Sequence, residues 1–328
     1  MRFVTCLRSD FIGLLGASVL IMTACGGTSG GTTVMDLGSA AQDSNFVSTD
    51  GPGLSMNGDE AVITMTPFDV ASGDEVFKCQ TFANPFGADI DVKEFESHMT
   101  SGSHHLLLLF EDNAVDGSLQ DCSGLTFGPM PYGTQRPDGD VTFPDGIATV
   151  IKATQGFKVV AHYINATMDP TPIHAQVQVK MHKADPSTIT QHAGVFFLNN
   201  VSGLLPPAGG IPAGETKTIT ASYTTKIPIN VLYATAHMHS RSTNMTATYN
   251  DTNMLYTTDS WSAAPMQAYT PPIALPVGTK ITWSCTIANN TQDTITFGES
   301  AMTNEMCIFN GQYYPVPDNA APTISVQK

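Results

Sequence analysis

Turn-forming residues interrupt short apolar runs from about residue 60 to the end of the chain. The runs are rich in Val, Ile, Thr, Tyr and Phe, and Gly, Pro, Asn and Asp separate them, which is typical of β-strands joined by turns. No stretch shows sustained helical periodicity. The sequence therefore predicts an all-β fold of the sandwich or barrel type. We expect strands over residues 60–66, 104–110, 157–164, 175–181, 216–223, 230–239, 245–249 and 280–287.

The chain length of 328 residues allows two domains, each with its own core. A boundary is expected at Lys183-Ala184-Asp185-Pro186, where turn residues precede a fresh apolar run at Val195-Phe196-Phe197-Leu198. We therefore predict two tandem β-sandwich domains, an N-terminal one over residues 58–186 and a C-terminal one over residues 187–328.

The first residues are similar to an export signal. Arg2 and Arg8 accompany an apolar stretch that is too short to span a bilayer comfortably. The following Met22-Thr23-Ala24-Cys25 resembles the lipobox of bacterial lipoproteins, in which the cysteine carries the lipid. We therefore expect a signal peptide over residues 1–24, lipidation at Cys25 and a flexible tether over residues 25–57. The protein would then be lipid-anchored in the bacterial cell envelope, and the outer membrane is its expected location. An ordinary cleaved signal with a chance cysteine is the alternative.

Charge and cysteine content narrow the possible partners. The formal charge of −15 becomes −16 without residues 1–24, because these carry two arginines and one aspartate. Such a chain repels nucleic acid, which is excluded as a partner. The four cysteines that remain besides Cys25 are an even number in an oxidising compartment, which favours two disulfides.

Five histidines and one methionine fall into four short segments, two in each half of the chain, which suggests one metal site per half. They are His104, His105, His162, His237, His239 and Met306. His237 and His239 are two residues apart in an expected strand, so both imidazoles lie on one face and Met238 lies on the other. A chance His-x-His pair on a surface strand remains the alternative.

The other members are less regular. The adjacent His104 and His105 would point to opposite faces of a regular strand, so joint ligation requires a strand end, a bulge or different ring nitrogens. His162 lies inside an apolar strand, and taken alone it is an ordinary core residue. Taken alone, Met306 is also a core residue, although its neighbour Cys307 could pair with Cys285 and fix the position of its strand.

Ligand chemistry favours copper for this set. Imidazole suits copper, zinc, iron and nickel, whereas a thioether adds a preference for Cu(I). A site of three histidines beside a site of two histidines and one methionine therefore argues for redox copper, two ions per chain, over structural zinc.

These residues resemble the copper type II, ascorbate-dependent monooxygenases, the family of dopamine β-monooxygenase and peptidylglycine α-hydroxylating monooxygenase. The stretches that carry the resemblance are 103–110, 162–165, 237–239 and 298–307, continuing to Tyr313-Tyr314-Pro315, and their order and approximate spacing also match. The resemblance extends from about residue 60 to 318 and is thin between these stretches.

The resemblance implies two jelly-roll-like β domains that face each other across a solvent-filled cleft, each with one copper. It implies that His104, His105 and His162 bind an electron-storing copper, and that His237, His239 and Met306 bind the copper at which oxygen is activated and a C–H bond is hydroxylated. Cys285 with Cys307 resembles a family disulfide beside the methionine. Cys79 resembles a family cysteine, and we infer its pairing with Cys122 from what remains.

Two positions depart from the peptide-hydroxylating branch. An arginine that helps to bind the substrate carboxylate there is Thr235 here, and a tyrosine four residues after the methionine is Asn310. The clamp for a peptide C-terminus is therefore missing, and peptide amidation is not expected.

The leading hypothesis is an exported copper monooxygenase that uses O₂, an electron donor such as ascorbate, and a small organic substrate. A copper-binding or delivery lipoprotein without catalysis is the alternative, and a third interpretation treats the histidines as core residues. The sequence assigns no role to four further histidines, His98, His174, His182 and His192.

Overall fold

Strands account for nearly all regular structure in the residues that the computed structural model describes, which are 51–205, 209–317 and 323–328. These residues contain no α-helix, and their one 3-10 helix is η1 (Pro186–Thr188). The expected all-β fold is therefore confirmed. Among the described residues, no helix has the length and apolar character needed to cross a bilayer.

The N-terminal expectations fall mostly outside this range. Residues 1–24 and Cys25 are not among the described residues. The expected tether over residues 25–57 overlaps the described residues at its C-terminal end. This end of the expectation is wrong, because β1 (Gly53–Asn57) pairs with β2 (Glu60–Thr64). A tight turn at Gly58, where φ is +63°, connects these two strands, so that β1 lies at the edge of its sheet beside β2.

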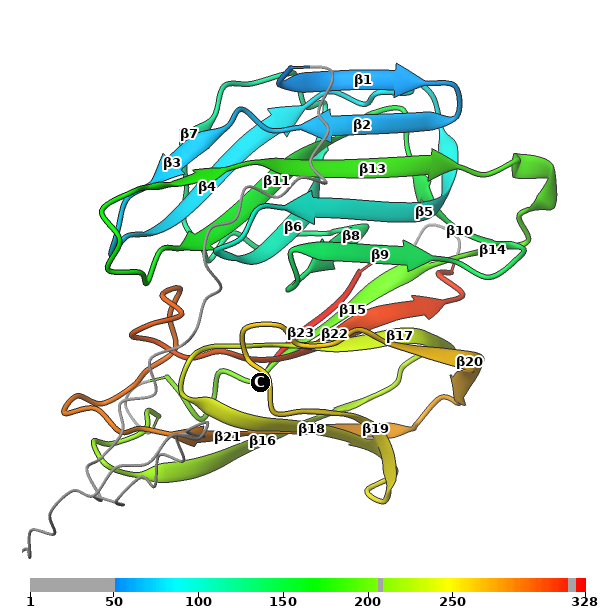
Figure 1. The fold of residues 1–328 in the computed structure, drawn as a ribbon. Helices are drawn as coiled ribbons and strands as arrows, with labels where there is room; N and C mark the ends of the chain where they lie inside the picture. Colours follow the sequence, from blue (N-terminus) through cyan, green and yellow to red (C-terminus); the bar gives the residue numbers. More distant parts are fainter. Residues whose placement is uncertain (1–50, 206–208, 318–322) are drawn as a thin grey trace, which may run out of the picture. The chain divides into compact units, whose positions relative to one another are not determined.

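The first half of the chain forms two sheets (Figure 1). One has the order β1-β2-β13-β5-β10-β14, with β9 also paired to β5, and the other has the order β7-β4-β11-β6-β8. A short pair, β3 with β12, accompanies them. The bounds are β3 (Phe68–Val70), β4 (Glu75–Phe82), β5 (Ile90–Met99), β6 (Ser103–Asp112), β7 (Gln120–Asp121), β8 (Tyr132–Thr134), β9 (Asp138–Thr142), β10 (Ile147–Ile151), β11 (Gln155–Ile164), β12 (Ile173–Ala175), β13 (Val177–Lys183) and β14 (Gln191–His192).

The second half also forms two sheets. Their orders are β20-β17-β22-β15-β23 and β16-β21-β18-β19. The bounds are β15 (Gly194–Asn199), β16 (Thr216–Thr224), β17 (Ile229–Met238), β18 (Ser242–Tyr249), β19 (Asn253–Thr258), β20 (Gln267–Leu275), β21 (Lys280–Ala288), β22 (Cys307–Tyr314) and β23 (Thr323–Gln327). All eight expected strands therefore have a counterpart in the structure.

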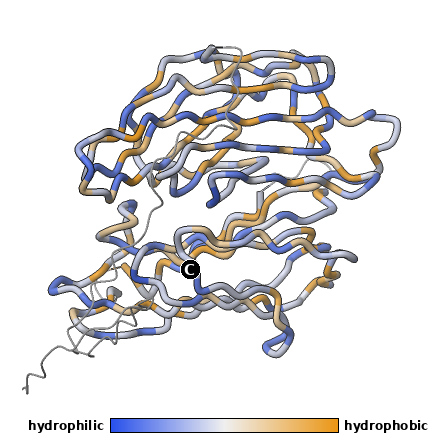
Figure 2. The backbone as a smooth tube through the Cα atoms, in the orientation of Figure 1, coloured by the Kyte–Doolittle hydropathy of each residue, from blue (hydrophilic) through white to orange (hydrophobic). Residues whose placement is uncertain are grey.

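Each half has its own hydrophobic core, and the strands alternate between apolar and polar residues accordingly (Figure 2). In β21, for example, Ile281, Trp283, Cys285 and Ile287 are buried and their neighbours are more exposed. A disulfide joins Cys285 in β21 to Cys307 in β22 and so connects the two sheets of the second half, while Cys79 in β4 is joined to Cys122. These are the two pairings that we expected.

The central strands β6 and β11 are buried on both faces, which explains their long apolar runs. Leu106 and Leu108 point into the first core, whereas Leu109 belongs to a third cluster with Val160 of β11. That cluster also contains Phe197, Met306 and other residues of the second half. Apolar side chains on facing sheets therefore hold the two halves together.

The transition between the halves lies slightly later than the expected boundary. β13 ends at Lys183, but Gln191 and His192 of β14 still pair in parallel with Ile147 and Ala148 of β10. The second sandwich therefore begins with β15 at Gly194.

Candidate metal centre

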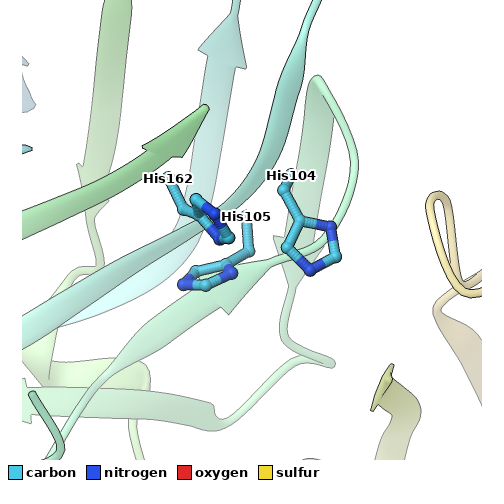
Figure 3. A group of neighbouring side chains, drawn as sticks. All are labelled: His104, His105 and His162. Atoms are coloured by element: carbon cyan, nitrogen blue, oxygen red, sulfur yellow. The ribbon is translucent and has the colours of Figure 1, made fainter. Parts of the chain in front are cut away.

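A β-bulge brings the adjacent His104 and His105 together. His105 lies opposite His162 in the register of β6 and β11, and the next pair is Ser103 with Tyr163, so His104 is the extra residue. A regular strand would point the two side chains to opposite faces, whereas a bulge interrupts that alternation. Figure 3 shows the three imidazoles gathered beside one another.

Each histidine of this three-histidine group has a ring nitrogen that is available to a metal ion. Nε2 of His162 donates a hydrogen bond to Oε1 of Glu75 at 2.9 Å, so Nδ1 carries the free lone pair. Nδ1 of His162, Nδ1 of His105 and Nε2 of His104 are buried, and no described residue offers them a hydrogen bond. One ring nitrogen from each residue can be chosen so that all three lie within 4.8 Å of one another.

His237 and His239 form a second group at the end of β17. Their Nε2 atoms lie 3.2 Å apart, while Met238 between them points into the second core. The other nitrogens act as donors, because Nδ1 of His237 donates to Oε1 of Gln135 at 3.0 Å and Nδ1 of His239 donates to the Asn304 carbonyl at 3.3 Å. Both Nε2 lone pairs therefore face the same small space, as two imidazole ligands of one ion would.

Met306 lies immediately before β22 and is buried, with 2% of its surface exposed. It lines a cavity together with His105 and His237. The disulfide at the neighbouring Cys307 fixes this end of β22 to β21. The position suits a third ligand for the His237 and His239 group, and its role as a ligand stays a prediction.

Glu305 fixes the turn that follows His239. Its carboxylate accepts hydrogen bonds from the backbone N–H groups of Arg241 at 2.6 Å and His239 at 3.2 Å, and from Oγ of Ser242 at 2.9 Å. Burial raises the pKa of Glu305 to about 7, although these hydrogen bonds act in the opposite direction. The residue next to Met306 therefore holds His239 in place.

The two histidine groups are contiguous, which differs from the separation across a solvent-filled cleft that the resemblance implied. The ring centroid of His104 is 5.3 Å from that of His237 and 5.6 Å from that of His239. His104 therefore also fits a metal-binding group with His237 and His239. The physical reason is the contact between the halves, in which Glu75 accepts hydrogen bonds from Ser300 Oγ and the Ala301 N–H besides that from His162.

A comparison with known protein families finds a match in the second half of the chain. Residues 191–327 match the family model described as copper type II ascorbate-dependent monooxygenase, C-terminal domain. The second half of the chain is a copper type II ascorbate-dependent monooxygenase C-terminal domain by this match. The matched segment contains His237, His239, Met306 and the Cys285–Cys307 disulfide. No curated protein matches the sequence.

Solved structures show only weak likeness to this chain. PNGase F, a glycosylasparaginase from Flavobacterium meningosepticum, has 11% identity and a TM-score of 0.35, with 79% of this chain and 97% of that chain covered. The STIV MCP structure has 6% identity and a TM-score of 0.35, with 81% and 98% covered. The cowpea mosaic virus top component has 11% identity and a TM-score of 0.33, with 86% and 100% covered. TM-scores this low carry no inference about fold or activity.

The copper on which the family depends fits the residues present. Three buried imidazole nitrogens without a hydrogen-bond partner, and two Nε2 atoms that face each other at 3.2 Å, are costly arrangements unless a cation binds them. One ion can bind both Nε2 atoms, because metal–imidazole bonds of about 2.0–2.1 Å are longer than half of the 3.2 Å that separates the two atoms. The donor set of neutral nitrogens with a nearby thioether agrees with copper.

Burial also keeps these imidazoles neutral. Desolvation lowers the pKa of His104, His105 and His239 well below the usual value, and neighbouring imidazoles add to the effect. Desolvation likewise lowers the pKa of His237 to about 3. For His162, burial lowers the pKa while the hydrogen bond to Glu75 acts in the opposite direction. Neutral imidazole is the form that binds a metal.

Each of the four histidines without an assigned role contacts a carboxylate. The pairs are His98 with Asp138, His174 with Asp69 at 2.9 Å, His182 with Glu96 at 2.6 Å and His192 with Asp91 at 2.9 Å. They lie outside the two histidine groups.

Sequence reasoning missed the residues that support the candidate ligands. Glu75 and Gln135 each bind the outer nitrogen of a histidine, the position where metal-binding histidines usually have a carboxylate, carbonyl or amide partner. Any metal-binding histidine is expected to have such a partner, but the sequence does not indicate which of its many carboxylates and amides is the partner of a given histidine. Only the pairing of distant strands identifies them.

Proposed function

We propose that this protein is an exported copper-dependent monooxygenase that hydroxylates a C–H bond of a small organic substrate. Two observations support the proposal: five histidines form two overlapping groups that could each hold a metal ion, and His105, His237 and Met306 line one cavity. When bound, two copper ions supply one-electron redox chemistry and O₂ activation, with ascorbate or an equivalent donor as the external reductant.

The chain's own residues would prepare the site for this chemistry. His104, His105 and His162 would hold the electron-storing copper, and His237, His239 and Met306 would hold the copper near the substrate. Glu75 and Gln135 set the tautomers of His162 and His237 and thereby keep their lone pairs directed inward. Apolar side chains of the facing sheets would limit the access of water to the region beside the ligands.

Export and lipid attachment at Cys25 belong to the same proposal. The lipobox-like Met22-Thr23-Ala24-Cys25 and the two disulfides support an oxidising compartment. Mass spectrometry of the protein from a bacterial membrane fraction tests this part. A mature chain that begins with a lipid-modified Cys25 is expected, and an unmodified chain that retains residues 1–24 would contradict it.

Oxygen uptake tests the catalytic proposal. Copper-loaded protein given ascorbate should consume oxygen with at least one member of a panel of benzylic and aliphatic compounds, and a His237→Ala/His239→Ala variant should not. The copper content is measured first in both proteins. Two bound coppers and no uptake with any compound would overturn the proposal.

The contiguity of the two histidine groups favours one competing function, a copper-delivery lipoprotein. His104 fits both groups, and this overlap would let an ion pass between them over a short distance. A carrier would bind copper and pass it to a chelator within minutes but show no ascorbate-dependent oxygen uptake. Transfer kinetics measured beside the uptake assay therefore separate the two functions.

A further inference from the structure

A third group of possible metal ligands lies on the sheet that contains the adjacent strands β2, β13 and β5 (Figure 1). Its centre is His182 of β13, which lies opposite Glu60 of β2 on one side and Glu94 of β5 on the other. Glu96, two residues beyond Glu94, shares its face of the sheet. Met181, the neighbour of His182, is buried in the first core, so His182 lies on the opposite, outer face. The group is therefore separate from the two histidine groups, whose strands belong to other sheets.

The donor atoms of this outer group converge on one point. One nitrogen of His182 and one carboxylate oxygen from each of Glu94 and Glu96 lie within 4.8 Å of one another. Nε2 of His182 is 2.6 Å from Oε1 of Glu96 and 3.8 Å from Oε2 of Glu60, so a fourth donor borders the same nitrogen. The ligand atoms of a tetrahedral zinc ion are about 3.3 Å apart for bonds of about 2.0 Å. Small rotations of these partly exposed side chains would therefore let them bind one ion.

A β-bulge in β5 contributes to this convergence. His182 pairs with Glu94. The next residue of β13, Lys183, pairs with Val92, so Lys93 is the extra residue in β5. Val92 is buried, whereas Lys93 and Glu94 are both on the outer face. Bulges change the direction of side chains and are common beside functional sites, and this one turns Glu94 towards His182.

The negative charge of the outer group is not balanced by lysine or arginine. In the part of the chain that the structure describes, neither residue type forms an ion pair with Glu60, Glu94 or Glu96. Asp140 of β9, opposite Glu96, adds a further carboxylate to this face. One imidazole therefore borders several carboxylates that repel one another. A divalent cation would offset this repulsion and would take the place of the proton between His182 and Glu96.

We propose that His182, Glu94 and Glu96 form a third metal site, which binds one zinc ion. Glu60 would be the fourth donor. Zinc follows from the donor set, because zinc binds imidazole and carboxylate together, whereas calcium and magnesium bind oxygen donors. Oγ1 of Thr142 donates a hydrogen bond to Oε1 of Glu94 at 3.0 Å and would hold that carboxylate in position. The ion would join β2, β13 and β5 and so stabilise their sheet, and the proposal does not depend on the proposed function.

Equilibrium dialysis of the full chain tests the proposal, with zinc and copper measured in the same sample. The chain is first loaded with copper(I) without oxygen, so that the two histidine groups are filled, and is then dialysed against increasing zinc. The wild type should take up one zinc ion per chain while its copper content stays constant. No uptake of zinc, or uptake of zinc only in exchange for copper, would overturn the proposal.

Two variants test the ligands. His182→Gln and Glu94→Gln should each weaken zinc binding by at least about tenfold, because each removes a donor, and should leave the copper content unchanged. His174→Gln is the matched control, since His174 forms the same kind of pair with one carboxylate, Asp69, at 2.9 Å, and it should bind zinc as the wild type does.

Thermal unfolding gives a second readout. Zinc should raise the unfolding temperature of the wild type and of His174→Gln but not that of His182→Gln, because binding to the folded state stabilises it. Equal zinc affinity of His182→Gln and the wild type would place the zinc elsewhere and overturn the proposal. Zinc uptake by the wild type needs no variant, so its absence would decide the question even if a variant did not fold.

Discussion

Glu75 accepts a hydrogen bond from His162 at 2.9 Å and, through the same carboxylate, hydrogen bonds from Ser300 and Ala301 in the other half of the chain. Burial would raise the pKa of Glu75, but these three hydrogen bonds outweigh that effect and lower it, so the group is a carboxylate at neutral pH. It therefore sets the tautomer of His162 and connects the halves at the same point.

Glu75→Gln should weaken copper binding at the three-histidine group by about 10–100-fold, because an amide holds the Nε2–H of His162 less strongly. Competition with a copper(I) chelator measures this affinity. Asp69→Asn is the matched control, since Asp69 contacts His174 at 2.9 Å outside the two histidine groups, and it should leave the affinity unchanged. Equal affinities for Glu75→Gln and the wild type would remove Glu75 from the site.

The architecture was largely predictable from the sequence, because alternation and turn residues act locally. The eight expected strands are present, and β21 shows why, with every second side chain buried. The sequence did not predict β1, because Gly53–Asn57 is short and follows a glycine-containing stretch. Its pairing with β2 is what identifies it as a strand. Pairing across the chain also places β14 with the first half.

The candidate ligands were predictable as residue types, but their arrangement was not. The bulge at His104 depends on the register between β6 and β11, which the sequence of either strand does not specify. The contact between His104 and His237 depends on apolar residues of the third cluster, such as Leu109 and Phe197, which the sequence does not distinguish from core residues.

Acid should destabilise the metal-free protein. The pKa values of the buried imidazoles are lowered in the folded state, so below about pH 6.5 the unfolded chain binds protons that the folded chain does not, and stability falls as the pH falls. The loss is about 2 kcal/mol by pH 5 for each imidazole that stays neutral. Glu305 acts in the opposite sense, because its raised pKa of about 7 favours the folded state at lower pH, but it is one group against several.

Urea unfolding at pH 7.5 and pH 5 measures this dependence. His174→Gln, at an exposed histidine, should retain the full loss, whereas His104→Leu should reduce it. A metal-free protein that is equally stable at both pH values would show that the imidazoles are not held neutral by the fold.

Gly311 allows close approach of β17 and β22 at the cavity. A Cβ atom there would lie 2.0 Å from the Tyr233 carbonyl oxygen and 2.6 Å from the Phe196 ring. Gly311→Ala should therefore lower the free energy of unfolding by at least about 1–3 kcal/mol, because the backbone of β17 or β22 must move to make room for the Cβ atom. Gly128→Ala, where a Cβ meets nothing within 4 Å, is the control, and equal urea midpoints for the two variants would contradict the packing described here.

The central claim is that Met306 completes a second copper site with His237 and His239. X-ray absorption of the copper(I)-loaded protein tests it most directly, because sulfur and nitrogen scatterers are distinguishable and no substrate is needed. The wild type and Met130→Ala, which loses another buried methionine of the same cavity, should show a copper–sulfur distance in addition to imidazole nitrogens. Met306→Ala should lack the sulfur and keep the nitrogens, and a spectrum of Met306→Ala that equals that of the wild type would contradict the account.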